Sequence, residues 1–417
     1  MTGKQYPAVL RSPGIGTWFA VLVCQRFPVA AAPLALVFLG HAVTGSYAVG
    51  ALLGGGHALA EAVAAGPLGR RFDRRPARSE TALVLGVEAV AFALLTLLAT
   101  AAMAATTVTA TASASLWVLA GMLVLAGLGG AVSAGAHGGL RALLVRLAPP
   151  EHRVAALSLE SAASTTVWTV APALVALLAA LDARLPILLM VAVAAAGALA
   201  GRRLLDPPRT ATGHPARVWR VSWPAMAYDG AMMFAFGAVS LALPLLLTAH
   251  GAGAALSGPV LTAYTLAGIG GGLLYGARAW PGTPLAQAAL LSAGIGLALG
   301  AAALVPVLGL VVALFAVAGL MQTPALTARA VSLQDRLPES QWAVGFSGMY
   351  AAGGLGYGAA GMTVAWLVER VGAQSAIGLC VALSTVVALG SSMADRRPPR
   401  TARRVALEDH QVSLADR

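Results

Sequence analysis

The sequence predicts an all-α integral membrane protein in which twelve transmembrane helices form two six-helix bundles related by a parallel pseudo-repeat. Three features predict this fold: a low content of charge, twelve apolar windows, and basic residues that gather on one side of the expected membrane. Of the 417 residues, 58% are hydrophobic and 10% are charged, whereas a soluble protein carries about 25% charged residues. So few polar side chains cannot cover a soluble protein of this length. An ordinary cytosolic enzyme, a secreted disulfide scaffold and a disordered protein are therefore excluded.

The apolar windows give the number and order of the spans, because a helix needs about 20 apolar residues to cross the hydrocarbon. The first half contains six windows, at 14–39, 46–66, 80–103, 115–138, 154–181 and 186–204. The second half contains six more, at 223–248, 257–277, 285–304, 306–328, 342–367 and 374–394. The fifth and eleventh windows are long, so we expect these helices to tilt or protrude.

The basic residues set the orientation. With twelve spans and both chain ends on one side, 24 of the 27 basic residues fall on that side, and only Arg184 and Arg370 fall on the other. Basic residues mark the cytoplasmic side of a membrane protein. We therefore expect a multi-pass protein of the plasma membrane with both termini in the cytoplasm. The net charge of +11 then reflects membrane orientation, and nucleic acid is not expected as a partner.

A polar segment rich in proline and arginine separates the two halves. We expect an N-terminal six-helix bundle at 1–204, a cytoplasmic linker at 205–222, a C-terminal bundle at 223–394 and a cytoplasmic tail at 395–417. The halves echo each other, since Gly69 and Gly276 close the second and eighth spans and lie 207 residues apart. Two halves in the same orientation are typical of transporters that work by alternating access.

Several segments together resemble the major facilitator superfamily and, more narrowly, its actinobacterial members described as drug or metabolite exporters. They are Arg26-Phe27-Pro28 to Leu36, Thr44 to Ala48, the loop 66–78, Ala171 to Leu174, and Gly271 to Gly276. The resemblance covers nearly the whole chain. It implies a monomeric secondary transporter, a proton antiporter that exports a small, largely apolar organic compound. Proton-coupled uptake, or a sugar-type transporter of the same fold, is the alternative.

The loop between the second and third spans carries the family's cytoplasmic gate motif. Gly69-Arg70 and Asp73-Arg74 fit the motif, but Pro76 stands where the family has a second glycine. The resemblance implies that Asp73 faces the N-terminal end of the eleventh helix, which is the positive end of its dipole. This contact would help to hold the cytoplasmic side shut. The alternative is an arginine-rich loop that serves only the membrane orientation.

Two further positions depart from the family. The fifth helix of exporters carries a Gly-Pro pair, and here Ala171-Pro172 keeps only the proline, which we expect to bend the helix. The arginine that the family usually has midway along the fourth helix is missing, and that helix carries several glycines and His137 instead. Any proton coupling must therefore use other groups.

Ionisable residues inside the spans are the candidates for substrate and proton binding, because burying a charge there costs at least about 2.5–3.5 kcal/mol. Arg26, next to Gln25, lies near the middle of the first span. It either binds an anionic group of the substrate or pairs with a carboxylate at the cavity wall. Glu160, with Ser161 and Ser164, gives the fifth helix a polar face that suggests a cavity wall.

The seventh span offers a second candidate face. Asp229, Met233, Phe236 and Ser240 recur at helical spacing. An acid on such a face suits an apolar or cationic substrate, or a proton site. The alternative is a solvated aspartate close to the cytoplasmic interface.

Three further buried ionisable groups are secondary candidates. His57 and Glu61 are four residues apart on the second helix, which allows them to hydrogen-bond. Alternatively, Glu61 pairs with arginines of the neighbouring loop. Glu88 on the third helix is expected to form a structural pair with a neighbour.

An intramembrane enzyme is the rival class of function. Gly345-Phe346-Ser347-Gly348 matches the Gly-x-Ser-Gly of rhomboid proteases, but the only later histidine is His410 in the polar tail, so the serine lacks a base. The chain also has no zinc-protease or ATP-binding motif. We therefore expect no enzyme, no cofactor and no metal. An ion gradient then supplies the energy of transport, and protons are the expected coupling ion.

Overall fold

The protein is all-helical in the computed structural model, which describes residues 5–109, 116–207, 216–249, 251–253 and 256–395. The helices of the first half are α1 (Gln5–Arg11), α2 (Ile15–Thr44), α3 (Tyr47–Arg74), α4 (Ala77–Thr109), α5 (Leu116–Leu147), α6 (Arg153–Ala179) and α7 (Leu185–Gly201). Those of the second half are α8 (Ala216–Ala249), α9 (Ser257–Gly276), α10 (Pro284–Leu304), α11 (Leu308–Gln334) and α12 (Trp342–Ala394). Short 3-10 turns, Pro150–His152 and Glu339–Gln341, precede α6 and α12.

Twelve spans follow from these helices, as the sequence predicts. The helices α2 to α11 supply ten, and α12 supplies two because it breaks at Gly372. There φ is 78° and ψ is 165°, a backbone conformation that only glycine adopts without strain. Within the described residues, nine helices are long and apolar enough to cross a membrane on length and composition alone. The shorter α7, the less apolar α9 and the second arm of α12 complete the twelve.

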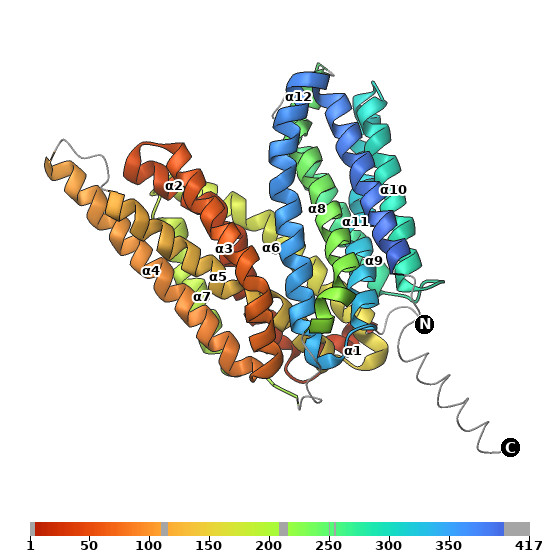
Figure 1. The fold of residues 1–417 in the computed structure, drawn as a ribbon, viewed down its shortest axis with the longest axis horizontal. Helices are drawn as coiled ribbons and strands as arrows, with labels where there is room; N and C mark the ends of the chain where they lie inside the picture. The colour runs from red at the N-terminus through yellow and green to blue at the C-terminus, as the bar shows by residue number, and fades with distance from the viewer. Residues whose placement is uncertain (1–4, 110–115, 208–215, 250, 254–255, 396–417) are drawn as a thin grey trace.

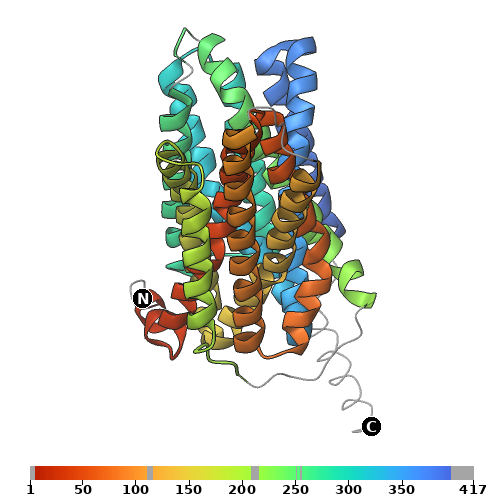
Figure 2. The ribbon, with the colours of Figure 1, turned by 90° about the vertical axis from the view of Figure 1, so that its left-hand side faces the viewer.

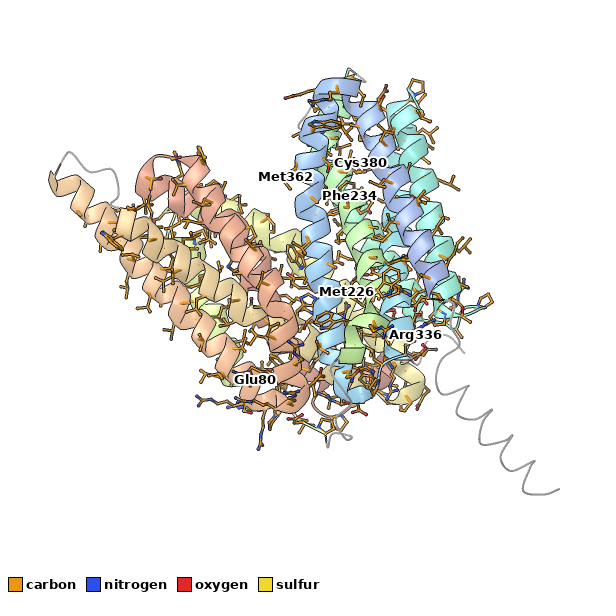
Figure 3. The ribbon with its side chains drawn as sticks, viewed as in Figure 1. Glu80, Met226, Phe234, Arg336, Met362 and Cys380 are labelled. Atoms are coloured by element: carbon orange, nitrogen blue, oxygen red, sulfur yellow. The ribbon has the colours of Figure 1, made fainter. Side chains whose placement is uncertain are left out.

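The two bundles form a V (Figure 1). Helices α2 to α7 make one arm and α8 to α12 the other, and the helices within each arm run side by side (Figures 1 and 2). The arms meet at the end where α3 turns into α4 and where α11 leads into α12, and they separate at the opposite end. We call the first the arginine-rich end; Glu80 and Arg336 both lie there (Figure 3).

Packing explains why the arms meet at only one end. Each bundle has its own apolar core, with Leu36 and Phe92 in the first and Phe315 in the second. A further core cluster at the arginine-rich end joins the two bundles, and it includes Phe72 of α3 and Phe346 of α12. Large apolar side chains remain exposed on the outer surfaces, as expected of helices that face lipid.

The helices run further than the apolar windows, and this corrects two predictions. The segment that carries the gate motif was predicted as a loop, but α3 continues as a helix to Arg74. Similarly, α8 begins at Ala216, inside the predicted linker 205–222. An apolar window marks only the part of a helix that lies in the hydrocarbon, whereas the helix itself can continue through the polar interface. Residues 208–215 of the linker and 396–417 of the tail lie outside the described residues.

Candidate functional site

A buried cluster of three charges lies inside the first bundle. Nη2 of Arg26 on α2 lies 2.9 Å from Oε1 of Glu160 on α6, and Nη2 of Arg141 on α5 lies 2.5 Å from Oε2 of the same carboxylate. The side chains of Arg26 and Glu160 are 0% exposed, and that of Arg141 is 15% exposed. The cluster therefore holds two positive charges against one negative charge away from water.

Polar neighbours complete the cluster. The hydroxyl of Ser164 accepts a hydrogen bond from Nε of Arg26 and donates one to Oε1 of Glu160, both at 3.1 Å. The side-chain oxygen of Gln25 accepts another hydrogen bond from Arg26. Buried charges are tolerated only with such partners. Of the two interpretations left open for Arg26, the structure shows the pairing with a carboxylate.

Sequence reasoning missed Arg141, which it counted among the basic residues of the arginine-rich end. Because α5 continues beyond the window that ends at 138, Arg141 is still helical and reaches Glu160. Its guanidinium also lies 5.7 Å from the ring centre of Phe346 on α12, so it touches both bundles. One signal was available: His137 and Arg141 are four residues apart and so share a helix face.

A second group of ionisable side chains lies where α12 meets the first bundle. The ring of Tyr350 on α12 stacks on the imidazole of His137 on α5, with 3.6 Å between the ring centres. Glu61 on α3 and Glu88 on α4 are buried close by. Among the described residues, Oε1 of Glu61 and both carboxylate oxygens of Glu88 have no hydrogen-bond partner. Sequence reasoning did not single out Tyr350, because a tyrosine in an apolar helix is usually a packing residue.

Two predictions about this group are wrong. His57 does not bond to Glu61, because a ring nitrogen of His57 lies 3.0 Å from the carbonyl oxygen of Ala126 on α5. Its Nε2 has no partner within the described part of the chain. Glu88 is fully buried but forms no hydrogen bond with any residue that the structure describes. The physical reason for the first is the close approach of α5 and α3 at Gly130, where a side chain would overlap the carbonyl oxygen of His57. His57 therefore faces α5 rather than the next turn of its own helix.

The predicted face of α8 packs within the second bundle. Phe236 stacks on Tyr264 of α9 with 5.4 Å between the ring centres, and Met233 packs beside Gly353 of α12. Asp229 is half-buried, and its Oδ1 has no hydrogen-bond partner among the described residues. The structure does not pair Asp229 with Arg26, whose carboxylate partner is Glu160.

The bundles are held together at the arginine-rich end by Asp73. Its Oδ1 accepts a hydrogen bond from the backbone amide of Ala343, and its Oδ2 accepts one from Val344, both at 3.0 Å. These amides lie at the start of α12, where a helix has unpaired N–H groups and a positive dipole end. The expected contact between Asp73 and this helix end is therefore present.

Glycines let the backbones come close beside Asp73. A methyl group at Gly69 of α3 would lie 2.8 Å from the Cα of Val344, and one at Gly138 of α5 would overlap the carbonyl oxygen of Ala343. The remaining motif residues, Arg70 and Arg74, line a surface pocket of about 310 Å³. Between them, Arg71 forms an ion pair with Glu80.

A second line of contact joins α6 to α9 and α11. A methyl group at Gly276 of α9 would lie 2.5 Å from the Cβ of Ser158 on α6. The hydroxyl of Thr327 on α11 donates to that of Ser161 at 3.3 Å. Pro172 lies inside the same helix α6, where it removes one backbone hydrogen bond. Within the described part of the chain, no three His, Cys, Asp or Glu side chains are placed to hold a metal ion.

Comparison of sequences gives no match, either to a protein-family model or to a curated protein. Comparison of structures gives several. A bacterial homologue of the iron transporter ferroportin, in an outward-facing state with soaked iron, has a TM-score of 0.71 at 12% identity, over 91% of this chain and 97% of that one. The human organic anion transporter MFSD10 has a TM-score of 0.64 at 16% identity, over 94% and 100%.

The fucose:proton symporter FucP of E. coli is also similar, with a TM-score of 0.70 at 14% identity, over 93% of this chain and 100% of that one. A second FucP structure is described as a major facilitator superfamily transporter in the outward conformation. The chain therefore has the fold of major facilitator superfamily transporters.

Proposed function

We propose that the protein is a secondary active transporter that moves a small organic molecule across the membrane by alternating access. The observation that carries this proposal is the asymmetric contact between the bundles. Asp73 and two glycines close the arginine-rich end, whereas the bundles separate at the other end (Figure 1). Backbone contacts this close form an interface with two discrete states, apart or together, as alternating access requires.

The substrate and proton pathway is proposed to run along the buried ionisable groups between the bundles. Arg26, Glu160 and Gln25 form its wall on the first bundle, and Asp229 lies on the second. Met233 and Phe236 lie one and two turns further along α8 than Asp229 and add apolar side chains, which suit a largely apolar organic compound. Carboxyl oxygens without partners are the natural proton sites in a membrane protein, and FucP is described as a proton symporter.

The remaining parts of the proposal rest on the sequence. The protein works in the plasma membrane as a monomer, with bundles at 1–204 and 223–394 and both termini in the cytoplasm. Closure at the arginine-rich end is then closure at the cytoplasmic side. The direction of transport is export, on the resemblance to drug and metabolite exporters.

Purified protein in liposomes loaded with a pH-sensitive dye tests the coupling. A panel of small apolar compounds is added under an imposed pH gradient, and the uptake of each is followed by mass spectrometry. We expect at least one compound to move with an opposite proton flux. Flux driven by a sodium gradient and not by a pH gradient would refute proton coupling.

Two variants test the site. Asp229→Asn and Arg26→Ala are expected to impair transport of that compound without loss of folded protein. Asp182→Asn is a control, because it changes a half-buried acid outside the spans that pairs with Arg184. Normal transport by both site variants would show that the pathway lies elsewhere. The amount of the compound inside cells with and without the protein decides the direction of transport. Less compound in cells that have the protein indicates export, and more indicates uptake.

A further inference from the structure

The short helix α1 precedes the first span and contacts both bundles at the arginine-rich end. Its chain continues into α2 of the first bundle, yet Figure 1 shows α1 at the lower end of the second arm. There it lies beside the line of contact between α6 of the first bundle and α9 of the second, where Ser158 meets Gly276. Neither the contact of Asp73 nor the proposed pathway involves α1.

α1 is fixed to the first bundle. Val9 is 0% exposed and belongs to the same apolar core cluster as Trp18 of α2 and Leu144 of α5. Gly14 makes the turn from α1 into α2 with a φ of 81°, a conformation that suits glycine. A methyl group at Gly14 would lie 2.8 Å from the side chain of Leu205. Because of this buried anchor and tight turn, we expect α1 to move with the first bundle.

Tyr6 of α1 reaches across to the second bundle. Its hydroxyl donates a hydrogen bond to the backbone carbonyl oxygen of Leu273 on α9. The same oxygen accepts a hydrogen bond from the amide of Ala277 at 3.1 Å, so Tyr6 uses the second lone pair of that carbonyl. Gly276 makes room for the phenol, because a methyl group there would lie 2.5 Å from the hydroxyl oxygen.

The contact of Tyr6 is separate from that of Asp73. Asp73 joins α3 to the start of α12, whereas Tyr6 joins α1 to α9. When the bundles part at the arginine-rich end, α9 moves away from α1 and the hydrogen bond of Tyr6 must break. A contact that exists in only one of two states favours that state by its own free energy.

We propose that α1 is a strap that holds the arginine-rich end closed through the hydrogen bond of Tyr6 to α9. The inference rests on the proposed function, since the strap sets the balance between the two states of alternating access. It adds a gating residue outside the gate motif and outside the spans. A tyrosine hydroxyl titrates near a pH of about 10, so the strap acts independently of the proton that the transporter is proposed to use.

The distance across the arginine-rich end reports the strap. Spin labels are attached at Arg78→Cys on α4 and Ala279→Cys beside α9, two exposed positions on opposite bundles. The full chain carries Cys24→Ala and Cys380→Ala and is measured in lipid nanodiscs by pulsed electron paramagnetic resonance. The populations at short and long distance give the ratio of closed to open protein.

Tyr6→Phe keeps the ring and removes the hydroxyl, so the ratio of closed to open protein should fall by about two- to tenfold. Tyr47→Phe is the matched control. It makes the same chemical change on an exposed tyrosine at the start of α3, at the opposite end of the bundle, and it should leave the ratio unchanged.

Both substitutions are also made in the Asp73→Asn protein. Loss of the other closing contact enlarges the open population, so a change in the ratio can be measured even if the wild type is almost wholly closed. Because Tyr6 and Asp73 share no partner, the fold-change caused by Tyr6→Phe should be similar in the two backgrounds.

A second pair of labels tests whether α1 moves with the first bundle. It joins Ala279→Cys to Leu10→Cys on α1, where Leu10 is 54% exposed. Opening should lengthen this distance together with the distance from Arg78→Cys. An α1 that stays beside α9 while the other distance lengthens would overturn the strap.

The outcomes distinguish the strap from the proposed function. Unchanged populations on Tyr6→Phe in both backgrounds overturn the strap alone, since substrate flux in liposomes tests transport separately. If the arginine-rich end keeps one distance in every protein, including Asp73→Asn, then alternating access at this end fails and the strap fails with it.

Discussion

Replacing Gly138 by alanine is expected to open the arginine-rich end. Gly138 lies on α5, where its Cα faces the first turn of α12. A methyl group there would overlap the carbonyl oxygen of Ala343 and the amide nitrogen of Ser347. Both are backbone atoms, so neither can rotate away as a side chain would. The overlap exists only while the bundles are in contact, so separation of the bundles relieves it.

The size of the effect follows from the packing. Adding a methylene-sized group to a well-packed core costs about 1–3 kcal/mol. Because the cost falls on the closed state alone, the ratio of closed to open protein should drop by about 5- to 150-fold. Gly127→Ala on the same helix is the matched control. Its new methyl group would lie 3.7 Å from the Cβ of Ala60, an ordinary contact, while it gains the same helix propensity.

The assay is the distance between spin labels at Arg78→Cys on α4 and Ala279→Cys beside α9, two exposed positions on opposite bundles. It is measured by pulsed electron paramagnetic resonance on the full chain in lipid nanodiscs, with Cys24→Ala and Cys380→Ala in the background. In the Gly138→Ala protein we expect the long-distance population to grow at the expense of the short one, and in the Gly127→Ala protein we expect no change. A Gly138→Ala protein with the same distance distribution as the control would show that α5 and α12 do not meet as closely as described.

Three further substitutions test other contacts. Asp73→Asn removes the charge at the α12 N-terminus and one acceptor, so the closed state should lose about 1–2 kcal/mol, measured by the same label distance. Glu160→Gln leaves Arg26 and Arg141 without their carboxylate and should lower the free energy of unfolding by about 3–5 kcal/mol, measured by thermal unfolding. Arg26→Gln should lower it less, because Glu160 then keeps its ion pair with Arg141. Gly372→Ala forces a side chain into a glycine conformation and should cost about 1–3 kcal/mol, whereas Gly378→Ala should not.

Each of these has a contrary result. An unchanged label distance in the Asp73→Asn protein would remove Asp73 from the closing contact. Equal losses from Glu160→Gln and Arg26→Gln would mean that Arg141 does not share the carboxylate. Equal unfolding temperatures for Gly372→Ala and Gly378→Ala would show that α12 does not turn at Gly372.

The number and order of the spans could be predicted, because the hydrocarbon thickness requires about 20 apolar residues for each span and the sequence shows these windows one after another. The ends of the helices could not, since helices continue beyond the hydrocarbon. For this reason α3 was expected to end before the gate motif but continues to Arg74, and Arg141 was assigned to the polar surface although it lies in α5.

The candidate site was predictable only in part. Arg26 and Glu160 stood out because a buried charge is costly and needs a partner, and the structure pairs them. Tyr350 gave no such signal, because it stacks on His137 of the other bundle and its position depends on how the bundles dock. The predicted bond between His57 and Glu61 relied on spacing along one helix, and a close contact with α5 overrides that spacing.

Reciprocal movement at the two ends is the most direct test of alternating access. The labels at Arg78→Cys and Ala279→Cys report the arginine-rich end, and labels at Ala48→Cys and Val307→Cys, both exposed, report the opposite end. Asp182 lies near the opposite end, and hydrogen bonds from Arg184 lower its pKa to about 2. This ion pair therefore stays charged between pH 5 and pH 8 and does not itself respond to pH in this range.

We predict that a change of pH within this range shortens one distance and lengthens the other in the same protein. Two distances that change in the same sense would contradict transport by alternating access, and two distances that stay fixed would contradict its coupling to protons.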